Sequence, residues 1–376
     1  MAVRRGGVSE IGRYFLKLGV VGFGGPNAHI AAMHDDLVRR RGWVEERYFL
    51  DVVGVTNLIP GPNSSEVAIH LGYLRAGLLG GLTAGLSFMF PALLMMLALS
   101  WAYFSLGDFA VRQELLAGIQ PVALAVVLAT LWRLRSGVIG GWRKPILALA
   151  GVGLTLVFPR ALPLIVIGAG LVSLAASRAD GTLRSVLWLP VGLLAGSAVP
   201  GGGLLAVAWV FLRTGLLLFG GGLVLVALLG PEVVARGWLT EQQFLDGIAL
   251  GQATPGPITL TSVFVGYAVH GTVGALVATG AIYLPSFVAV LVGTGPFMRR
   301  FRENPSVAAF VEGITAASLG AVLAESALLG RTALAGGVRV AIFSLGLAAV
   351  LARVPVVWVV LGGALLGVAA GAAGLL

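Results

Sequence analysis

The sequence has no cysteine, four histidines and few charged residues, and each shortage excludes a class of protein. Without cysteine the chain has no disulfide, no thiolate nucleophile, no cysteine zinc site and no cysteine-ligated iron–sulfur cluster. Charged residues make up 11% of the 376 residues and hydrophobic residues 58%, a balance that excludes an ordinary soluble fold. The sequence therefore predicts an all-α polytopic membrane protein.

The apolar residues gather in long runs that are typical of membrane helices. The runs 77–104 and 307–329 exceed the about 20 residues that a bilayer-spanning helix needs, whereas the run 146–157 is shorter. The 56 glycines are spread through these runs, where small residues let helices approach closely. The stripe formed by Gly363, Gly367 and Gly371 fits either a homodimer face or packing within the chain.

The formal net charge of +9 collects in a few polar segments, at residues 39–41, 133–144 and 299–302. These clusters lack the interleaved aromatic residues of an RNA-binding surface, which argues against a nucleic-acid partner. In membrane proteins, Arg and Lys gather in cytoplasmic loops. We therefore interpret most of the positive charge as basic loops that set the orientation in the membrane. A few of the cations are left as candidates to bind an anionic substrate.

The chain repeats itself after about 195 residues, and this is its strongest internal signal. The segment 15–25 returns as 211–221. The segment 38–62 returns as 233–257 with 11 identities in 25 positions, where shared apolar composition gives about 3. Two copies of several membrane helices each are the pattern of secondary transporters.

The repeat predicts two halves that are inverted in the membrane. We expect an N-terminal repeat at residues 1–178, a polar linker at 179–186 and a C-terminal repeat at 187–376. The basic loop 35–47 has a weakly charged counterpart at 232–241 in the second half. For the next pair of loops the order is reversed, because residues 108–112 carry little charge and residues 299–302 are strongly basic. Inversion of the second half requires this alternation, since basic loops face the cytoplasm. Arg331 and Arg339 argue against inversion, because they would fall on the outer side.

Each half contains an apolar segment that is interrupted by Pro-Gly-Pro, and we expect a helix break there. Proline removes an amide donor and clashes with the preceding turn, while it suits the first position of a new helix. A new helix starts with free amides and a positive dipole end, which is how a membrane protein builds an anion site. A packing kink is the alternative. The breaks and the polar or amide groups that we expect to bind an anion are Pro60, Gly61, Pro62, Asn63, Ser64 and Ser65 in one half and Pro255, Gly256, Pro257, Ile258, Thr259 and Thr261 in the other, with Asn57 and Gln252 three residues before each Pro-Gly-Pro.

Lys17 lies inside an apolar run, and its counterpart in the repeat is Arg213. A cation in the hydrocarbon layer is costly unless it faces a cavity or a partner, so the pair suits a symmetric anion site. Snorkelling of Lys17 from a helix end is the alternative. Glycine clusters follow both cations and predict a second break in each half, at Gly24 and Gly25 and at Gly220 and Gly221.

Two acids within apolar segments are candidates for proton coupling. Glu66 lies one helical turn beyond the first Pro-Gly-Pro, and Glu325 lies deep in the run 307–329. The sequence has no nucleophile elbow, phosphate-binding loop or His-Glu-x-x-His motif, and we therefore predict no enzyme and no cofactor. His29, His34 and Asp35 are the one metal-like cluster, but their spacing is poor, and we predict no metal site.

Several long motifs in a fixed order resemble the chromate ion transporter family in its long two-domain form. These motifs are FxxLGxxxFGGPxAHI, VRRRGW and TNLIPGPNSSEVAIHLGY in the first half and GQATPGPITLTSVFVGY in the second. The resemblance runs from about Ile11 to Leu329. It implies export of chromate from the bacterial cytoplasm, energised by the membrane potential or the proton gradient, and hence chromate resistance.

The sequence thus predicts a multi-pass transporter of the bacterial inner membrane that binds a tetrahedral oxyanion between the two Pro-Gly-Pro breaks. Sulfate is the alternative substrate, because it has the same shape and charge as chromate. A membrane-embedded enzyme that uses His29, His34 and Asp35, or a structural scaffold, is the alternative outside transport.

Overall fold

The computed structural model describes residues 6–105, 110–135, 138, 141–177, 202–293 and 304–375. Helices dominate this part of the chain, and no strand occurs in the described ranges, so the predicted all-α fold class is confirmed. Five of its helices are long and apolar enough to cross a membrane. The predicted linker 179–186 lies outside the described residues.

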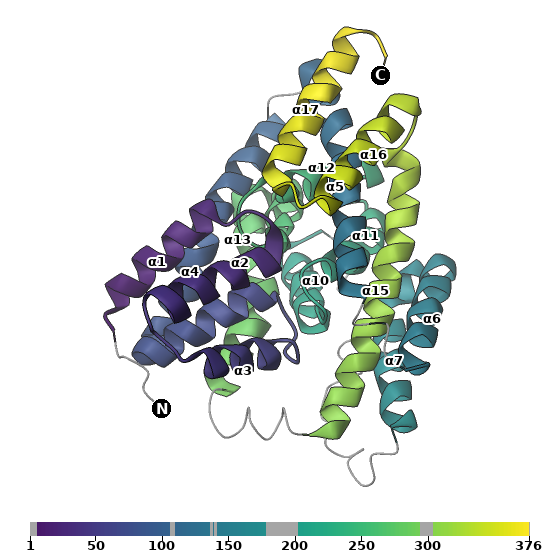
Figure 1. The fold of residues 1–376 in the computed structure, drawn as a ribbon. Coiled ribbons are helices and arrows are strands. Elements are labelled where there is room, and N and C mark those ends of the chain that lie inside the picture. Colours follow the sequence, from purple (N-terminus) through teal and green to yellow (C-terminus); the bar gives the residue numbers. More distant parts are fainter. Residues whose placement is uncertain are drawn as a thin grey trace.

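Among the described residues, the α-helices form two series in matching order, with seven in each. Figure 1 shows their arrangement. The first series comprises α1 (Val8–Val21), α2 (Gly25–Met33), α3 (Glu46–Thr56), α4 (Asn63–Ser105), α5 (Ala110–Leu134), α6 (Arg143–Val157) and α7 (Leu162–Ala176). The second comprises α10 (Leu204–Leu217), α11 (Val224–Ala235), α12 (Glu241–Ala253), α13 (Thr261–Gly293), α15 (Pro305–Ala333), α16 (Gly337–Leu351) and α17 (Val356–Ala372). The predicted pair of repeats is therefore confirmed, and its inverted orientation stays a prediction.

Helices α4 and α13 are each folded back on themselves at a glycine. Gly77 has φ +63° and Gly271 has φ +56°, a left-handed conformation that glycine adopts without steric cost. The arms on either side touch, since a methyl group on Gly72 or Gly266 would collide with the carbonyl eight residues later. Each Pro-Gly-Pro is therefore followed by a helical hairpin with a short first arm and a second arm long enough to span a bilayer.

The two repeats are interlocked through their later helices. The first-half helix α5 packs against α16 and α17, and the second-half helix α15 packs against α6 and α7 (Figure 1). Small residues bring these helices close together, because Gly118 on α5 lies against Gly363 and Gly367 on α17. The glycine stripe on α17 thus packs within the chain.

Large apolar side chains cover much of the outer surface. Leu79 and Phe90 on α4 and Leu365 on α17 are 66%, 49% and 72% exposed. Exposed apolar surface of this extent is costly in water and favourable in lipid. Together with the long apolar helices, it supports a multi-pass membrane protein.

Candidate functional site

Four interruptions of the helices lie at equivalent places in the two repeats. In the first half, α1 ends at Val21 before α2 begins, and α3 ends at Thr56 before α4 begins. In the second half, α10 ends at Leu217 and α12 ends at Ala253. The glycine-rich interruptions share one feature, because two glycines in each have positive φ: Gly24, Gly25, Gly220 and Gly221.

The two halves are joined by a reciprocal pair of backbone hydrogen bonds between these interruptions. The Gly61 N–H donates to the Leu218 carbonyl (2.9 Å), and the Gly256 N–H donates to the Gly22 carbonyl (2.8 Å). Gly61 and Gly256 are equivalent in the repeat, as are Gly22 and Leu218. Each Pro-Gly-Pro thus binds the end of the first helix of the opposite half. We call these contacts the Gly61 clasp and the Gly256 clasp.

The new helices after Pro-Gly-Pro begin differently in the two halves. Helix α4 starts at Asn63, directly after Pro62, whereas a short 3₁₀ turn (Ile258–Leu260) precedes α13. The amides of Ser65 and Leu260 already donate to the carbonyls of Pro62 and Pro257. Two amides in each half, at Asn63 and Ser64 and at Ile258 and Thr259, have no backbone acceptor among the described residues.

A buried polar cluster lies beside the Gly61 clasp. Glu66 is entirely buried next to the Ser286 hydroxyl on α13, which donates to the Pro60 carbonyl (3.3 Å). A methyl group on Gly61 would collide with both the Ser286 Oγ and the Glu66 Oε1, which shows how closely these atoms gather. The Glu66 carboxyl oxygens make no well-formed hydrogen bond in the described part of the chain. A buried carboxyl group in this position is costly when it is charged.

Three hydroxyl groups continue this cluster. Tyr283 on α13 lies 2.5 Å from the Thr259 hydroxyl and next to Ser65. The Ser65 hydroxyl is buried without a well-formed hydrogen bond in the described ranges. Tyr283 and Ser286 are site residues that the sequence reasoning missed. Alignment of the two repeats could have found them, because it places these polar residues opposite the apolar Met89 and Ala92 of the first half.

Other residues predicted for the site lie at the breaks but are already hydrogen-bonded. The Asn63 side-chain amide donates to Asn57 Oδ1 (2.5 Å), and the Thr261 hydroxyl donates to the Ile258 carbonyl (2.8 Å). The Ser64 hydroxyl lies 3.3 Å from Nδ1 of His29. Gln252 is half-buried in the last turn of α12.

His29 is a buried link rather than part of a metal cluster. Its Nε2 donates to the Gly22 carbonyl (2.8 Å), the same carbonyl that accepts the Gly256 N–H. His34 lies 3.4 Å from the Glu46 carboxylate instead. Sequence reasoning considered His29 only as a metal ligand, whereas the structure places it in support of the Gly256 clasp.

The structure does not bring the two predicted cations together at the breaks. Lys17 lies on the exposed face of α1. Arg213 forms an ion pair with Glu232 on α11 (2.8 Å), and Arg236 binds the other oxygen of the same carboxylate (2.6 Å). Glu325, the second predicted coupling acid, is 5% exposed and lies against Gly230 on α11, away from Glu66.

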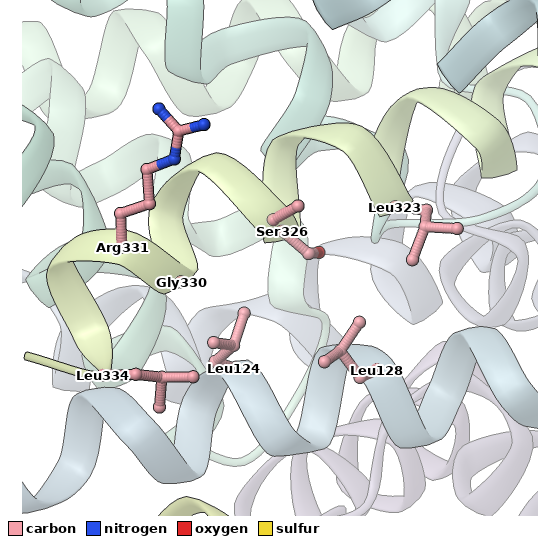
Figure 2. A pocket seen from close by; sticks show the side chains of 8 residues that line it. Leu124, Leu128, Leu323, Ser326, Gly330, Arg331 and Leu334 are labelled. Atoms are coloured by element: carbon pink, nitrogen blue, oxygen red, sulfur yellow. The ribbon is translucent and has the colours of Figure 1, made fainter. Parts of the chain in front are cut away.

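Two surface pockets accompany this arrangement, and neither is lined by a residue of the breaks. Figure 2 shows the first, a cavity of about 390 Å³ between α5 and α15, where Leu124 and Leu128 face Leu323 and the Arg331 side chain points away from α5. The second, of about 410 Å³, is polar and is lined by Asp246 and Arg339. Since Ser64, Ser65, Glu66 and Thr259 are buried, the structure shows the breaks in a closed arrangement.

Comparison with known proteins gives the same two-part division. The profile of the chromate transporter family matches residues 9–174 and 205–368. A probable chromate transport protein of Synechococcus elongatus is 32% identical over 87% of this chain and 86% of its own length. The chromate transport proteins of Cupriavidus metallidurans and Pseudomonas aeruginosa are 31% and 33% identical, each over 82% of this chain and over 79% and 77% of their own lengths. No solved structure matches the chain. The chain belongs to the chromate transporter family.

Proposed function

We propose that this protein exports chromate across the bacterial inner membrane as a secondary active transporter and thereby confers chromate resistance. The observation that carries the proposal is the meeting of two broken helices from opposite repeats, joined by the reciprocal Gly61 and Gly256 clasps. Broken helices at a repeat interface are the architecture with which secondary transporters bind ions near the bilayer midplane. Relatives named as chromate transport proteins support the choice of substrate.

The proposed oxyanion site lies between the two breaks. The free amides at the starts of the new helices point a positive dipole end at a tetrahedral dianion. The hydroxyls of Ser65 and Thr259 supply further donors. Because these groups are buried, the substrate enters only when the halves separate at a clasp, which gives alternating access a physical origin.

The countercharge and the coupling groups complete the proposal. Lys17 and Arg213 remain the proposed countercharges, although neither faces the breaks in the closed arrangement. Arg213 would have to exchange Glu232 for the substrate, and Lys17 would have to leave the exposed face of α1. Glu66 is the first candidate for proton coupling because it lies at a break, and Glu325 is the second. The membrane potential alone favours export, since each negative charge that leaves a cell at −100 mV releases about 2.3 kcal/mol.

Sulfate is the second candidate substrate, because the same amides and hydroxyls suit any tetrahedral dianion of this size. The test is uptake of labelled chromate and labelled sulfate into proteoliposomes that contain the wild type, Lys17→Ala, Arg213→Ala or Ser64→Ala. We expect chromate uptake by the wild type and at least a tenfold reduction for Arg213→Ala. Unchanged uptake in all three variants would remove the proposed site, and sulfate uptake without chromate uptake would replace the substrate.

A further inference from the structure

The repeat and the reciprocal clasps create two equivalent positions, and their chemistry differs. Beside the Gly61 clasp lie Ser65, Glu66, Tyr283 and Ser286. The repeat places Leu260, Thr261, Met89 and Ala92 at the equivalent positions beside the Gly256 clasp. Met89, Ala92 and Leu260 belong to one hydrophobic core cluster. The two clasps therefore occupy equivalent places in the repeat but have different side chains beside them.

One of these differences lies directly at the clasps, where the second half has Ser286 and the first half has Ala92. A methyl group on Gly61 would meet the Ser286 hydroxyl, and a methyl group on Gly256 would meet the Ala92 Cβ at 2.9 Å. Both second arms thus approach the opposite Pro-Gly-Pro at the same point. On one side the contact is a hydroxyl that lies beside a carboxyl group and donates to a carbonyl, and on the other side it is a methyl group.

We propose that Ser286 is a coupling residue that links the protonation of Glu66 to the Gly61 clasp, and that the Gly256 clasp has no such switch. This inference rests on the proposed transport function. With Glu66 protonated, its O–H donates to Ser286 Oγ, and the Ser286 O–H donates to the Pro60 carbonyl, so every proton in the chain has an acceptor. The chain joins α13 of one half to the break of the other.

Loss of the proton reverses this arrangement. A Glu66 carboxylate accepts the Ser286 hydrogen, so the Pro60 carbonyl loses its donor. The new charge is entirely buried and is unfavourable unless water or a cation reaches it. The Gly61 clasp, one residue from Pro60, is the contact that separates to admit them. The Gly256 clasp stays closed, because Ala92 carries no hydroxyl and His29 also holds the Gly22 carbonyl.

Several other titratable side chains on the elements around Glu66 have contacts of their own or lie on an exposed face. Tyr283 on α13 contacts Thr259, and His29 on α2 contacts Gly22 and Ser64. His70, one turn further along α4, lies 3.5 Å from the Tyr48 hydroxyl of α3. On α1, Glu10 forms an ion pair with Arg75, and Lys17 lies on the exposed face. Glu66 is therefore the group through which a proton acts on Ser286.

The test measures anion flux and proton movement together in proteoliposomes, with labelled chromate and an internal pH dye. Ser286→Ala removes the link and leaves space, and Ala92→Ser is the matched change at the equivalent position. Glu66→Gln retains the shape and the donor of the protonated acid. We expect chromate exchange without a pH gradient to stay within about threefold of the wild type in Ala92→Ser, and the unfolding midpoints of all three variants in detergent to match that of the wild type.

We expect the number of protons moved per anion to fall at least fivefold in Ser286→Ala and Glu66→Gln and to stay unchanged in Ala92→Ser. A wild-type unfolding midpoint shows that each variant has folded. A wild-type proton ratio in Ser286→Ala, or an equal loss in Ala92→Ser, would overturn the coupling role while leaving the proposed function intact. Absence of chromate flux in the wild type would overturn the proposed function and this inference with it.

Discussion

Substitution of Gly61 by alanine tests the packing of the central clasp. Gly61 has φ +148°, and strained backbone of this kind costs about 1–3 kcal/mol in a residue with a side chain. The added methyl group would also collide with Ser286 and Glu66, and overpacking of a close-packed interior costs typically about 1–3 kcal/mol. We therefore expect Gly61→Ala to lower the free energy of unfolding by about 2–6 kcal/mol.

Gly77→Ala is the matched control, because Gly77 also has positive φ but open space around its Cα. It should cost only the backbone strain, about 1–3 kcal/mol, without the added cost of overpacking. Both variants are compared with the wild type by denaturant unfolding in detergent micelles and by chromate flux. Equal destabilisation of the two variants, or full transport by Gly61→Ala, would refute the close contact between Gly61, Ser286 and Glu66.

Two further predictions concern the framework around the site. Glu232→Gln should destabilise the protein by about 3 kcal/mol in denaturant unfolding, because it leaves the half-buried Arg213 and Arg236 without their shared anion, and wild-type stability would contradict the ion-pair geometry. Gly363→Ala should lower the unfolding midpoint, because its methyl group would meet Val122 and the Gly118 carbonyl on α5, whereas Gly362→Ala faces open space and should have no effect. If Gly363→Ala instead changes only the oligomeric state, the α17 stripe serves a dimer.

The helix breaks could be predicted from the sequence because proline and glycine determine the backbone conformation locally. Pro-Gly-Pro fixes where a helix must stop, and the equal spacing in both halves reveals the repeat without any structure. The same reasoning missed the fold-back at Gly77 and Gly271. A glycine inside an apolar run is equally compatible with a straight helix, and only contacts between the arms show that the chain reverses.

The partners of buried residues were beyond the reach of sequence patterns. Lys17 and Arg213 are equivalent in sequence, yet Lys17 lies on an exposed face and Arg213 binds Glu232. Nothing local predicts this, because the direction of a side chain depends on which helices pack around it. The polar cluster was missed in part for the same reason, since Tyr283 and Ser286 belong to a distant apolar run in the other half.

Equilibrium binding of labelled chromate to the purified protein tests the central claim, that an oxyanion binds between the two breaks, most directly. The compared variants are Ser65→Ala and Thr259→Val at the breaks. The controls are Ser100→Ala and Thr279→Val, whose buried hydroxyls donate to carbonyls of their own helices (2.6 and 2.8 Å). Loss of one hydrogen bond to a charged ligand costs about 1.5–3 kcal/mol, so each break variant should bind at least about tenfold more weakly while the controls bind like the wild type. Wild-type affinity in both break variants would contradict the account.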